Sequence, residues 1–191
     1  TGISSSLAKK CIVAKYNDEL VDMSAPLEVD GSLELVTGTP EGLEPLLNHS
    51  CAHLLAQAIK ELYPNAMFGV GPAIEEGFYY DMDLGNVKLT EEDLPKIEKK
   101  MVALVASGAE IKRLVVSKAE ALELFKEDIY KQELINELPD EETITVYEQG
   151  KFRDLCRGPH VSSTKWLKNF KLLSVSGAYW RGDAKKAQLQ R

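Results

Sequence analysis

The first 37 residues contain short apolar runs separated by turn formers, a pattern that is typical of short β-strands. We predict three strands here, over 11–16, 20–23 and 33–36. Turn-forming pairs separate them, at Asn17-Asp18 and Asp30-Gly31. Because about forty residues are too few to bury an independent core, this segment is either a β appendage or the later part of a small domain that begins earlier.

The strongest helical pattern follows a run of turn formers at 37–42, which we interpret as a linker. Apolar residues recur at helical spacing over 43–62, and Pro64 ends the pattern. With a turn of about 100° per residue, His49 and His53 fall roughly 160° to 200° from the centre of the apolar stripe. The pattern therefore predicts that both imidazoles lie off the packed face.

Helical and strand-like patterns mix along the rest of the chain without a regular βαβ alternation, which favours an α+β fold. Further helices are predicted over 91–107, ending at Gly108, and over 118–126. Further strands are predicted over 66–70, 77–82, 111–117 and 143–147, with a strand-rich end over 170–180.

Composition fits an ordinary globular protein, because 44% of the 191 residues are apolar and 28% are charged. No apolar run approaches the roughly 18 residues of a membrane span, and the N-terminus lacks a secretory pattern. Cys11, Cys51 and Cys156 fit no disulfide framework, and Cys51 lies on the apolar stripe as a core residue. We therefore expect a cytoplasmic protein that makes no membrane contact.

Charge is distributed unevenly along the chain. Residues 151–191 hold ten basic and two acidic side chains, a net +8, so that the rest must carry −15 if the whole carries −7. Phosphate binding depends on local charge, so this asymmetry is a hint of nucleic-acid contact. A soluble domain with uneven charges explains the same numbers, and charge alone leaves both interpretations open.

All three histidines of the chain fall into two pairs that can carry chemistry. His49 and His53 are spaced to lie side by side on one helix face. Cys156 and His160 flank Gly158-Pro159, which does not continue a helix comfortably, so we place them at the edge between a strand and a loop. Three imidazoles and one thiol would complete a zinc tetrahedron, but four protein ligands leave no open position for an activated water.

Six motifs follow one another along the chain: His49-Ser50-Cys51-Ala52-His53, Gly71-Pro72, Gly77-Phe78-Tyr79-Tyr80-Asp81, Tyr130-Lys131, Asp154-Leu155-Cys156-Arg157-Gly158-Pro159-His160 and Gly177-Ala178-Tyr179-Trp180-Arg181-Gly182-Asp183. Together they resemble the editing domain of the bacterial threonyl-tRNA synthetase family. Residues 1–37 resemble the later part of the ubiquitin-like β-grasp (TGS) domain that precedes it. The resemblance implies an α+β fold, with a partial TGS domain over 1–37 and an editing domain of the threonyl/alanyl-tRNA synthetase type over 38–191.

The resemblance also implies an N-terminal fragment, because the first part of the TGS domain and the class II aminoacylation core are not in this sequence. Such a fragment cannot charge tRNA, and without the dimer contacts of the core we expect a monomer. Its implied activity is that of an aminoacyl-tRNA deacylase, which hydrolyses seryl-tRNA(Thr). The implied partner is the acceptor end of tRNA(Thr) carrying serine. A single methyl group supplies only about 1 to 3 kcal/mol of discrimination, so a second selection step against serine is needed.

Six residues would line the catalytic cleft by this resemblance: His49, His53, Lys131, Asp154, Cys156 and His160. We expect His49 to hold the terminal ribose or the ester. Lys131 and Asp154, with His160, would position or activate a water molecule. Without the resemblance, Lys131 and Asp154 would be interpreted as ordinary surface charges.

Gly71 and Tyr80 would shape the serine pocket, with Gly71 allowing close backbone approach. Hydrolysis of an activated ester needs no covalent intermediate, so Cys156 is not expected to act as a nucleophile. No catalytic metal is favoured, because hydrolysis in the threonyl-type family can be explained with water alone. Zinc at the His/Cys cluster stays an alternative.

Two other functions stay open. One is a zinc-dependent trans-editing hydrolase of the alanyl type, which would hold zinc at the His/Cys cluster. The other is a non-catalytic module that binds the tRNA acceptor stem through basic residues. The basic residues for this second function are Lys165, Lys168, Lys171, Arg181, Lys185 and Lys186.

Overall fold

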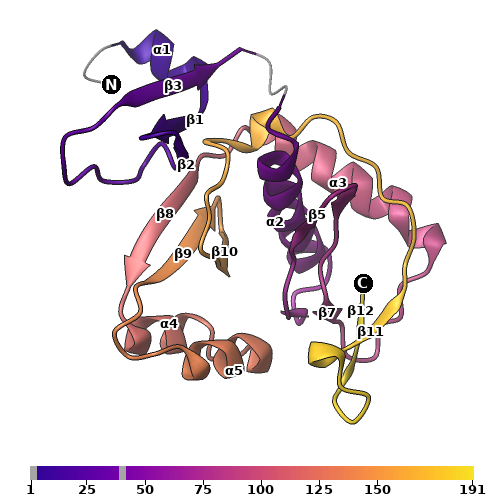
Figure 1. The fold of residues 1–191 in the computed structure, drawn as a ribbon. Helices are drawn as coiled ribbons and strands as arrows, with labels where there is room; N and C mark the ends of the chain where they lie inside the picture. Colours follow the sequence, from indigo (N-terminus) through magenta and orange to yellow (C-terminus); the bar gives the residue numbers. More distant parts are fainter. Residues whose placement is uncertain (1–3, 39–41) are drawn as a thin grey trace.

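A computed structural model describes residues 4–38 and 42–191. Short sheets and helices mix without βαβ units, which confirms the predicted α+β fold (Figure 1). The linker expected over 37–42 lies partly outside the described residues, which exclude 39–41. None of the described helices has the length and apolar character needed to cross a membrane.

The N-terminal segment folds as a three-stranded antiparallel sheet with one short helix. Strand β1 (Cys11–Tyr16) lies between β2 (Glu19–Val21) and β3 (Leu33–Thr37), which confirms the predicted strands. The helix α1 (Ser5–Lys10) was not predicted. Ile12 and Val13 are fully buried in the main hydrophobic core, so the segment shares that core and is not an isolated appendage.

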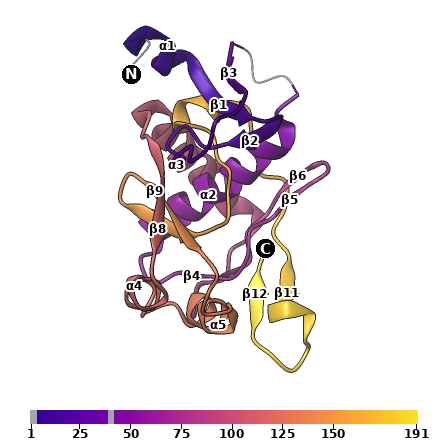
Figure 2. The same cartoon turned by 60° about the vertical axis from the view of Figure 1, so that its left-hand side comes forward.

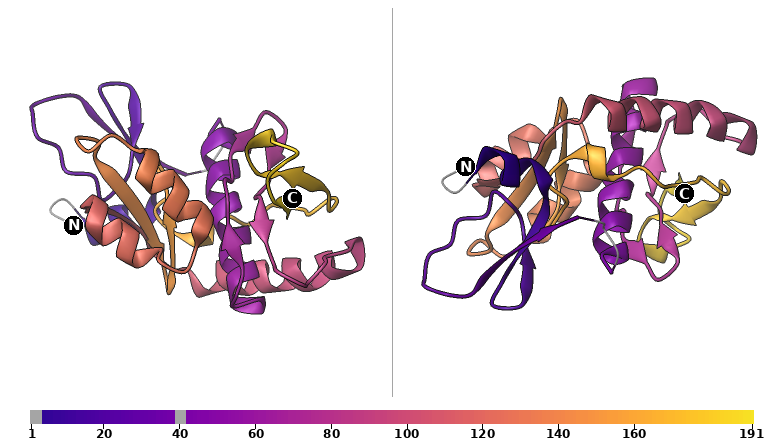
Figure 3. Two further views of the ribbon diagram at one scale, coloured as in Figure 1. Left: turned by 90° about the horizontal axis from the view of Figure 1, so that it is seen from below. Right: turned by 90° about the horizontal axis from the view of Figure 1, so that it is seen from above.

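The central helix α2 (Glu44–Leu62) confirms the predicted helix, but it is buried almost all round. Every residue from 50 to 59 is buried, including His53 at 4% exposure. The prediction that His53 lies off the packed face is therefore wrong. The reason is that α2 lies between two layers, so the side opposite its apolar stripe is also covered (Figure 3).

One of these layers is an antiparallel sheet in the order β10-β9-β8. Its strands are β8 (Ile111–Val116), β9 (Ile144–Gln149) and β10 (Phe152–Leu155). Helices α4 (Lys118–Leu124) and α5 (Ile129–Glu137) lie together beyond one end of this sheet (Figure 2). Strands β8 and β9 and helix α4 confirm predictions. A strand was expected before the loop of Cys156 and His160, and β10 is that strand, whereas α5 had not been predicted.

The other layer contains a long helix and very short strands. A 3₁₀ turn, η1 (Glu91–Asp93), leads into α3 (Leu94–Ser107), which ends at Gly108 in the left-handed conformation as predicted. The strand-like region 66–82 contains only two-residue strands, β4 (Met67–Phe68), β5 (Ala73–Ile74), β6 (Gly77–Phe78) and β7 (Met82–Asp83).

The C-terminal part differs from the predicted strand-rich end. After the 3₁₀ turn η2 (Thr164–Trp166), residues 167–176 are irregular. Strand β11 (Gly177–Tyr179), the turn η3 (Trp180–Gly182) and strand β12 (Gln188–Gln190) then form a hairpin that pairs with β7. The irregular stretch is held by a side chain, because the Leu172 N–H donates to the Glu98 carboxylate at 2.8 Å.

Candidate active site

Four side chains from two distant parts of the chain meet beside α2. His49 and His53 come from α2, and Cys156 and His160 come from the loop that follows β10. His49 Nε2 lies 3.0 Å from Cys156 Sγ, which lies 3.3 Å from His160 Nε2. The predicted convergence of the two pairs, and the position of the second pair after a strand, are both present. We call these four residues the His/Cys cluster.

The donor set of the His/Cys cluster suits zinc by type, because imidazole nitrogen and thiolate sulfur are its common ligands. One potential ligand atom from each residue lies within 4.8 Å of the others. The Nδ1 atom of His160 lies 3.1 Å from Ser50 Oγ, which leaves Nε2 directed at the cluster. Orientation through the second ring nitrogen is what a metal-binding histidine requires. The cluster is therefore able to hold a metal ion.

A second polar group lies buried next to this cluster. Lys131 Nζ lies 2.7 Å from Asp154 Oδ1, and the Tyr80 hydroxyl donates to Asp154 Oδ2 at 2.5 Å. Each of the three residues is at most 2% exposed, so Lys131 and Asp154 are not surface charges. His53 Nε2 lies 3.4 Å from Asp154 Oδ2 and joins the two polar groups. We call Lys131, Asp154 and Tyr80 the buried triad.

The local structure explains how a lysine comes to be buried here. Lys131 lies in the first turn of α5, where Asp128 accepts hydrogen bonds from the N–H groups of Tyr130 and Lys131 at 3.1 Å each. Its ammonium also donates to the Tyr80 hydroxyl at 2.9 Å and to the Gly69 carbonyl at 3.0 Å. All three ammonium hydrogens thus have partners, which offsets the cost of burying the charge.

Gly71 lies directly against the ring of Tyr80. A Cβ atom added at Gly71 would lie 2.3 Å from Tyr80 Cδ2, closer than two carbon atoms can approach. The missing side chain therefore allows Tyr80 to reach Asp154. The structure brings the two residues together as expected, and their role in selecting serine stays a prediction.

Burial sets the protonation of the His/Cys cluster. It lowers the pKa of His49, although Asp154 partly offsets the effect, and it lowers the pKa of His53 and His160 well below the usual value. Burial also raises the pKa of the Cys156 thiol to about 12. At neutral pH the cluster therefore consists of uncharged imidazoles, of which His53 and His160 are weak proton acceptors, and an uncharged thiol, which is a poor nucleophile.

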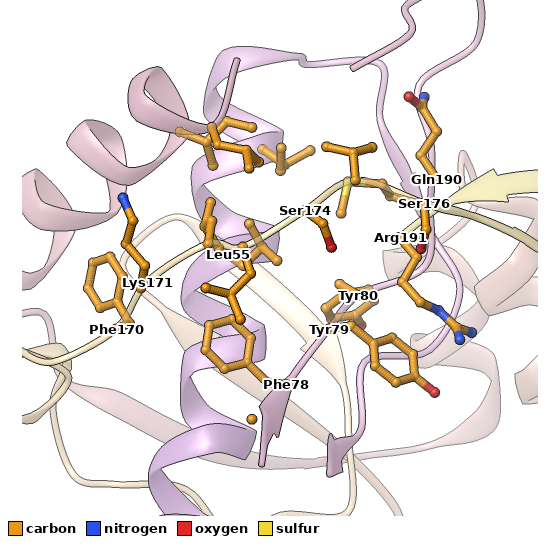
Figure 4. Close-up of a pocket in the computed structure, with 18 of the residues that line it drawn as sticks. Leu55, Phe78, Tyr79, Tyr80, Phe170, Lys171, Ser174, Ser176, Gln190 and Arg191 are labelled. Atoms are coloured by element: carbon orange, nitrogen blue, oxygen red, sulfur yellow. The ribbon is translucent and has the colours of Figure 1, made fainter. Parts of the chain in front are cut away.

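Two cavities adjoin the buried triad. One, of about 380 Å³, has the Tyr80 ring in its wall, with Leu55 and Phe78 nearby (Figure 4). At one end of it the Arg191 guanidinium lies 3.9 Å from the centre of the Tyr79 ring. The other, of about 760 Å³, is lined by Lys131 and Asp154 with residues of α2 and β10. The triad is therefore close to open space although it is itself buried.

Comparisons with known proteins match two segments of the chain by family and nearly all of it by sequence identity. The family model described as "Threonyl and Alanyl tRNA synthetase second additional domain" matches residues 144–191, and that of the TGS domain matches residues 1–37. Threonine–tRNA ligases of Staphylococcus carnosus, Enterococcus faecalis and Acholeplasma laidlawii are 55%, 54% and 56% identical to the chain, over 99% of its length. Along almost its whole length the chain is similar to a part of threonine–tRNA ligases. It spans about 29% of the length of these relatives.

Both segments matched by family models contribute to the site. Asp154, Cys156 and His160 lie in the segment matched to the second additional domain. Asp22, which the sequence analysis missed, lies in the TGS segment and accepts a hydrogen bond from the His160 N–H at 3.0 Å. No sequence pattern marks Asp22, because its contacts are more than a hundred residues away along the chain.

Tyr147 and Ser50 were missed as well. Tyr147 packs its ring edge-on against His160, with 4.5 Å between ring centres. Ser50 lies inside the first histidine motif, but its spacing within that motif does not indicate a contact with His160. Its hydroxyl accepts from the Val161 N–H at 3.2 Å as well as contacting the His160 ring. The alternation of residues in β9 would have placed Tyr147 on a buried face, but it could not have named His160 as its neighbour.

The positive charge of residues 151–191 is partly neutralised in the folded structure, because several of their basic side chains pair with carboxylates. These pairs are Arg153–Glu148, Arg157–Glu142, Lys171–Glu98, Arg181–Glu133, Arg181–Glu137, Lys186–Glu133 and Arg191–Asp81. The Lys165 ammonium donates to the Lys9 carbonyl at 2.6 Å. Among the residues proposed to bind the acceptor stem, Lys171, Arg181 and Lys186 thus already have acidic partners.

Proposed function

We propose that this chain carries an aminoacyl-tRNA deacylase site, which hydrolyses serine from seryl-tRNA(Thr) and spares threonyl-tRNA(Thr). The partner is the acceptor end of tRNA(Thr) carrying serine, bound by a monomer. The observation that carries the proposal is the contact between uncharged imidazoles and the buried Lys131–Asp154 pair, joined through His53. Ester hydrolysis needs a proton acceptor, which the neutral imidazole of His49 supplies in this proposal, and positive charge near the developing oxyanion, which Lys131 supplies.

His49 is the imidazole best placed to meet the substrate. It is partly exposed, whereas His53 and His160 are 4% and 1% exposed. Both ring nitrogens of His160 already have neighbours, Ser50 Oγ and Cys156 Sγ. In this proposal His49 holds the ribose or ester and His160 orients the thiol side of the cleft. Lys131 contributes to a water or oxyanion contact when one of its three present partners moves away.

A metal ion is a second candidate, favoured by the ligand spacing of the His/Cys cluster. With three of the four residues His49, His53, Cys156 and His160 as ligands and the fourth standing off, a zinc ion bound there would keep an open position and would supply Lewis-acid polarisation of the ester. Elemental analysis separates the two candidates, since a metal-dependent site must contain stoichiometric metal and lose activity after chelation. The water-only proposal expects chelation to leave the rate of serine release unchanged.

The test is the rate at which the purified chain releases amino acid from seryl-tRNA(Thr) and from threonyl-tRNA(Thr), at low salt to favour binding. His49→Ala and Lys131→Ala should abolish release of serine. Lys112→Ala, at an exposed lysine on β8, is the matched control. Binding of tRNA without release of serine would replace the proposal by a binding module, and release of both amino acids would contradict the assignment of Gly71 and Tyr80.

A further inference from the structure

The end of β2 meets the loop that carries Cys156 and His160. We infer that Asp22, in the TGS segment, is a positioning residue for the deacylation site: its carboxylate holds the 156–160 loop in the shape that presents Cys156 and His160 to the cleft. This inference rests on the proposed function. It makes the N-terminal sheet part of the hydrolytic site and not only its neighbour in sequence.

The two carboxylate oxygens of Asp22 accept hydrogen bonds from two different residues. Oδ1 accepts the His160 N–H at 3.0 Å, and Oδ2 accepts the Tyr147 hydroxyl at 2.6 Å. Hydrogen bonds to an ionised acceptor are about twice as strong as neutral ones. One side chain therefore ties the backbone of the loop to strand β9, across 138 and 125 residues of sequence.

Tyr147, which Asp22 holds, contacts the middle of the loop. A Cβ atom added at Gly158 would lie 1.8 Å from the Tyr147 hydroxyl oxygen, so the bare backbone of Gly158 lies directly on that hydroxyl. The Tyr147 ring also packs against the ring of His160. When Asp22 holds the Tyr147 hydroxyl, the loop is supported at Gly158 and at His160 together.

The His160 ring has a separate support on the α2 side, from Ser50. Downstream of the loop, the Ser162 N–H donates to the Ile12 carbonyl at 2.8 Å, and the Ser162 hydroxyl donates to the Cys11 carbonyl at 2.7 Å. These contacts with α2 and β1 do not involve Asp22. Removing the Asp22 carboxylate should therefore free the loop locally and leave the fold intact.

We expect Asp22→Ala to lower kcat for serine release by about tenfold to a hundredfold, because a displacement of about 1 Å can cost a hundredfold in rate. KM for seryl-tRNA(Thr) should stay within about twofold, since Asp22 touches no substrate-binding surface in this proposal. Asp22→Asn keeps one acceptor oxygen and should lose less. Tyr147→Phe breaks only the bond to Oδ2 and should also lose less than Asp22→Ala.

The experiment measures kcat, KM and melting temperature for these variants, with amide hydrogen exchange of residues 156–162 as a readout that does not depend on activity. Asp30→Ala is the matched control, because Asp30 is an exposed aspartate of the same segment. A lower kcat with unchanged KM, faster exchange of the loop and a partial recovery in Asp22→Asn support the inference. If Asp22→Ala does not fold, Asp22→Asn and Tyr147→Phe carry the test.

Three other results would contradict the inference about Asp22, and they can be told apart. Normal serine release by Asp22→Ala overturns the inference and leaves the proposed function standing. A fall in melting temperature with equal losses in all three variants reduces Asp22 to a structural residue, which also overturns it. No serine release by the unmodified chain overturns the proposed function, and the inference falls with it.

Discussion

The His/Cys cluster and the adjoining buried triad compensate for burial in different ways. The His/Cys cluster contains four titratable side chains that are uncharged at neutral pH, since burial lowers the pKa of its imidazoles and raises that of its thiol. The buried triad instead contains an ion pair, Lys131 and Asp154, 2.7 Å apart and surrounded by further hydrogen bonds. A buried charge depends on its partner, whereas a neutral group tolerates the loss of a neighbour. Removing one side chain should therefore lower the free energy of unfolding more in the buried triad than in the His/Cys cluster.

The largest expected effect is at the ion pair. Lys131→Met leaves the Asp154 carboxylate buried without its cation and should cost about 3 to 5 kcal/mol of unfolding free energy. Removing the charge of the partner as well, in Lys131→Met with Asp154→Asn, should recover part of the stability but no activity. Urea unfolding measures both, with Lys112→Met as the exposed control. A loss below about 1 kcal/mol in Lys131→Met would mean that the pair is not held as described.

The next effect tests the packing of the triad. Gly71→Ala forces its new methyl group against the Tyr80 ring, and overpacking of this kind costs about 1 to 3 kcal/mol. Serine release should fall at least tenfold, since the ring must move away from Asp154. Tyr80→Phe, which keeps the ring and removes the hydroxyl, separates packing from hydrogen bonding. Wild-type activity and stability in Gly71→Ala would contradict the close approach.

The third effect distinguishes the His/Cys cluster by its response to acid. In the unfolded chain His53 and His160 take up protons below about pH 6.5, whereas in the folded chain their lowered pKa keeps them neutral. Stability should therefore be complete above pH 6.5 and fall as the pH drops towards the folded pKa, by up to about 1.4 kcal/mol per pH unit for each imidazole. Urea unfolding at pH 7.5, 6.5 and 5.5 checks the slope. The variant His53→Gln should show a shallower slope, and an equal slope would exclude His53 as its source.

The smallest effect is expected at the thiol. Because the pKa of Cys156 is raised to about 12, the thiolate is scarce at neutral pH and Cys156→Ser should keep serine release within about threefold. The measurement is single-turnover hydrolysis of seryl-tRNA(Thr). A loss of a hundredfold or more would favour covalent catalysis, and a loss accompanied by departure of zinc would favour the metal-dependent alternative.

The sequence predicted the parts of the site that follow from local spacing. The helix carrying His49 and His53, and the loop edge carrying Cys156 and His160, both follow from short-range patterns that the structure confirms. Lys131 came from resemblance alone, since α5 had not been predicted. Its burial depends on Asp154, and periodicity within one segment cannot reveal such a contact.

The errors have the same physical origin. The side of α2 opposite its apolar stripe was expected to be unpacked, because a helical pattern does not show how many layers will cover the helix. Asp22 and Tyr147 were missed since their partners lie far away along the chain. The predicted strand-rich end over 170–180 failed where Leu172 hydrogen-bonds to the Glu98 side chain instead of a neighbouring strand.

The burial of residues 50–59 of α2 has a consequence for how this sequence can change during evolution. Residues 50–59 contact material on all sides, so each substitution there must be accommodated by two layers at once. In an alignment of relatives these positions should covary with both the β8–β10 sheet and the α3 layer. Substitutions in one layer should therefore be correlated with substitutions in the other, because both layers pack against the same helix.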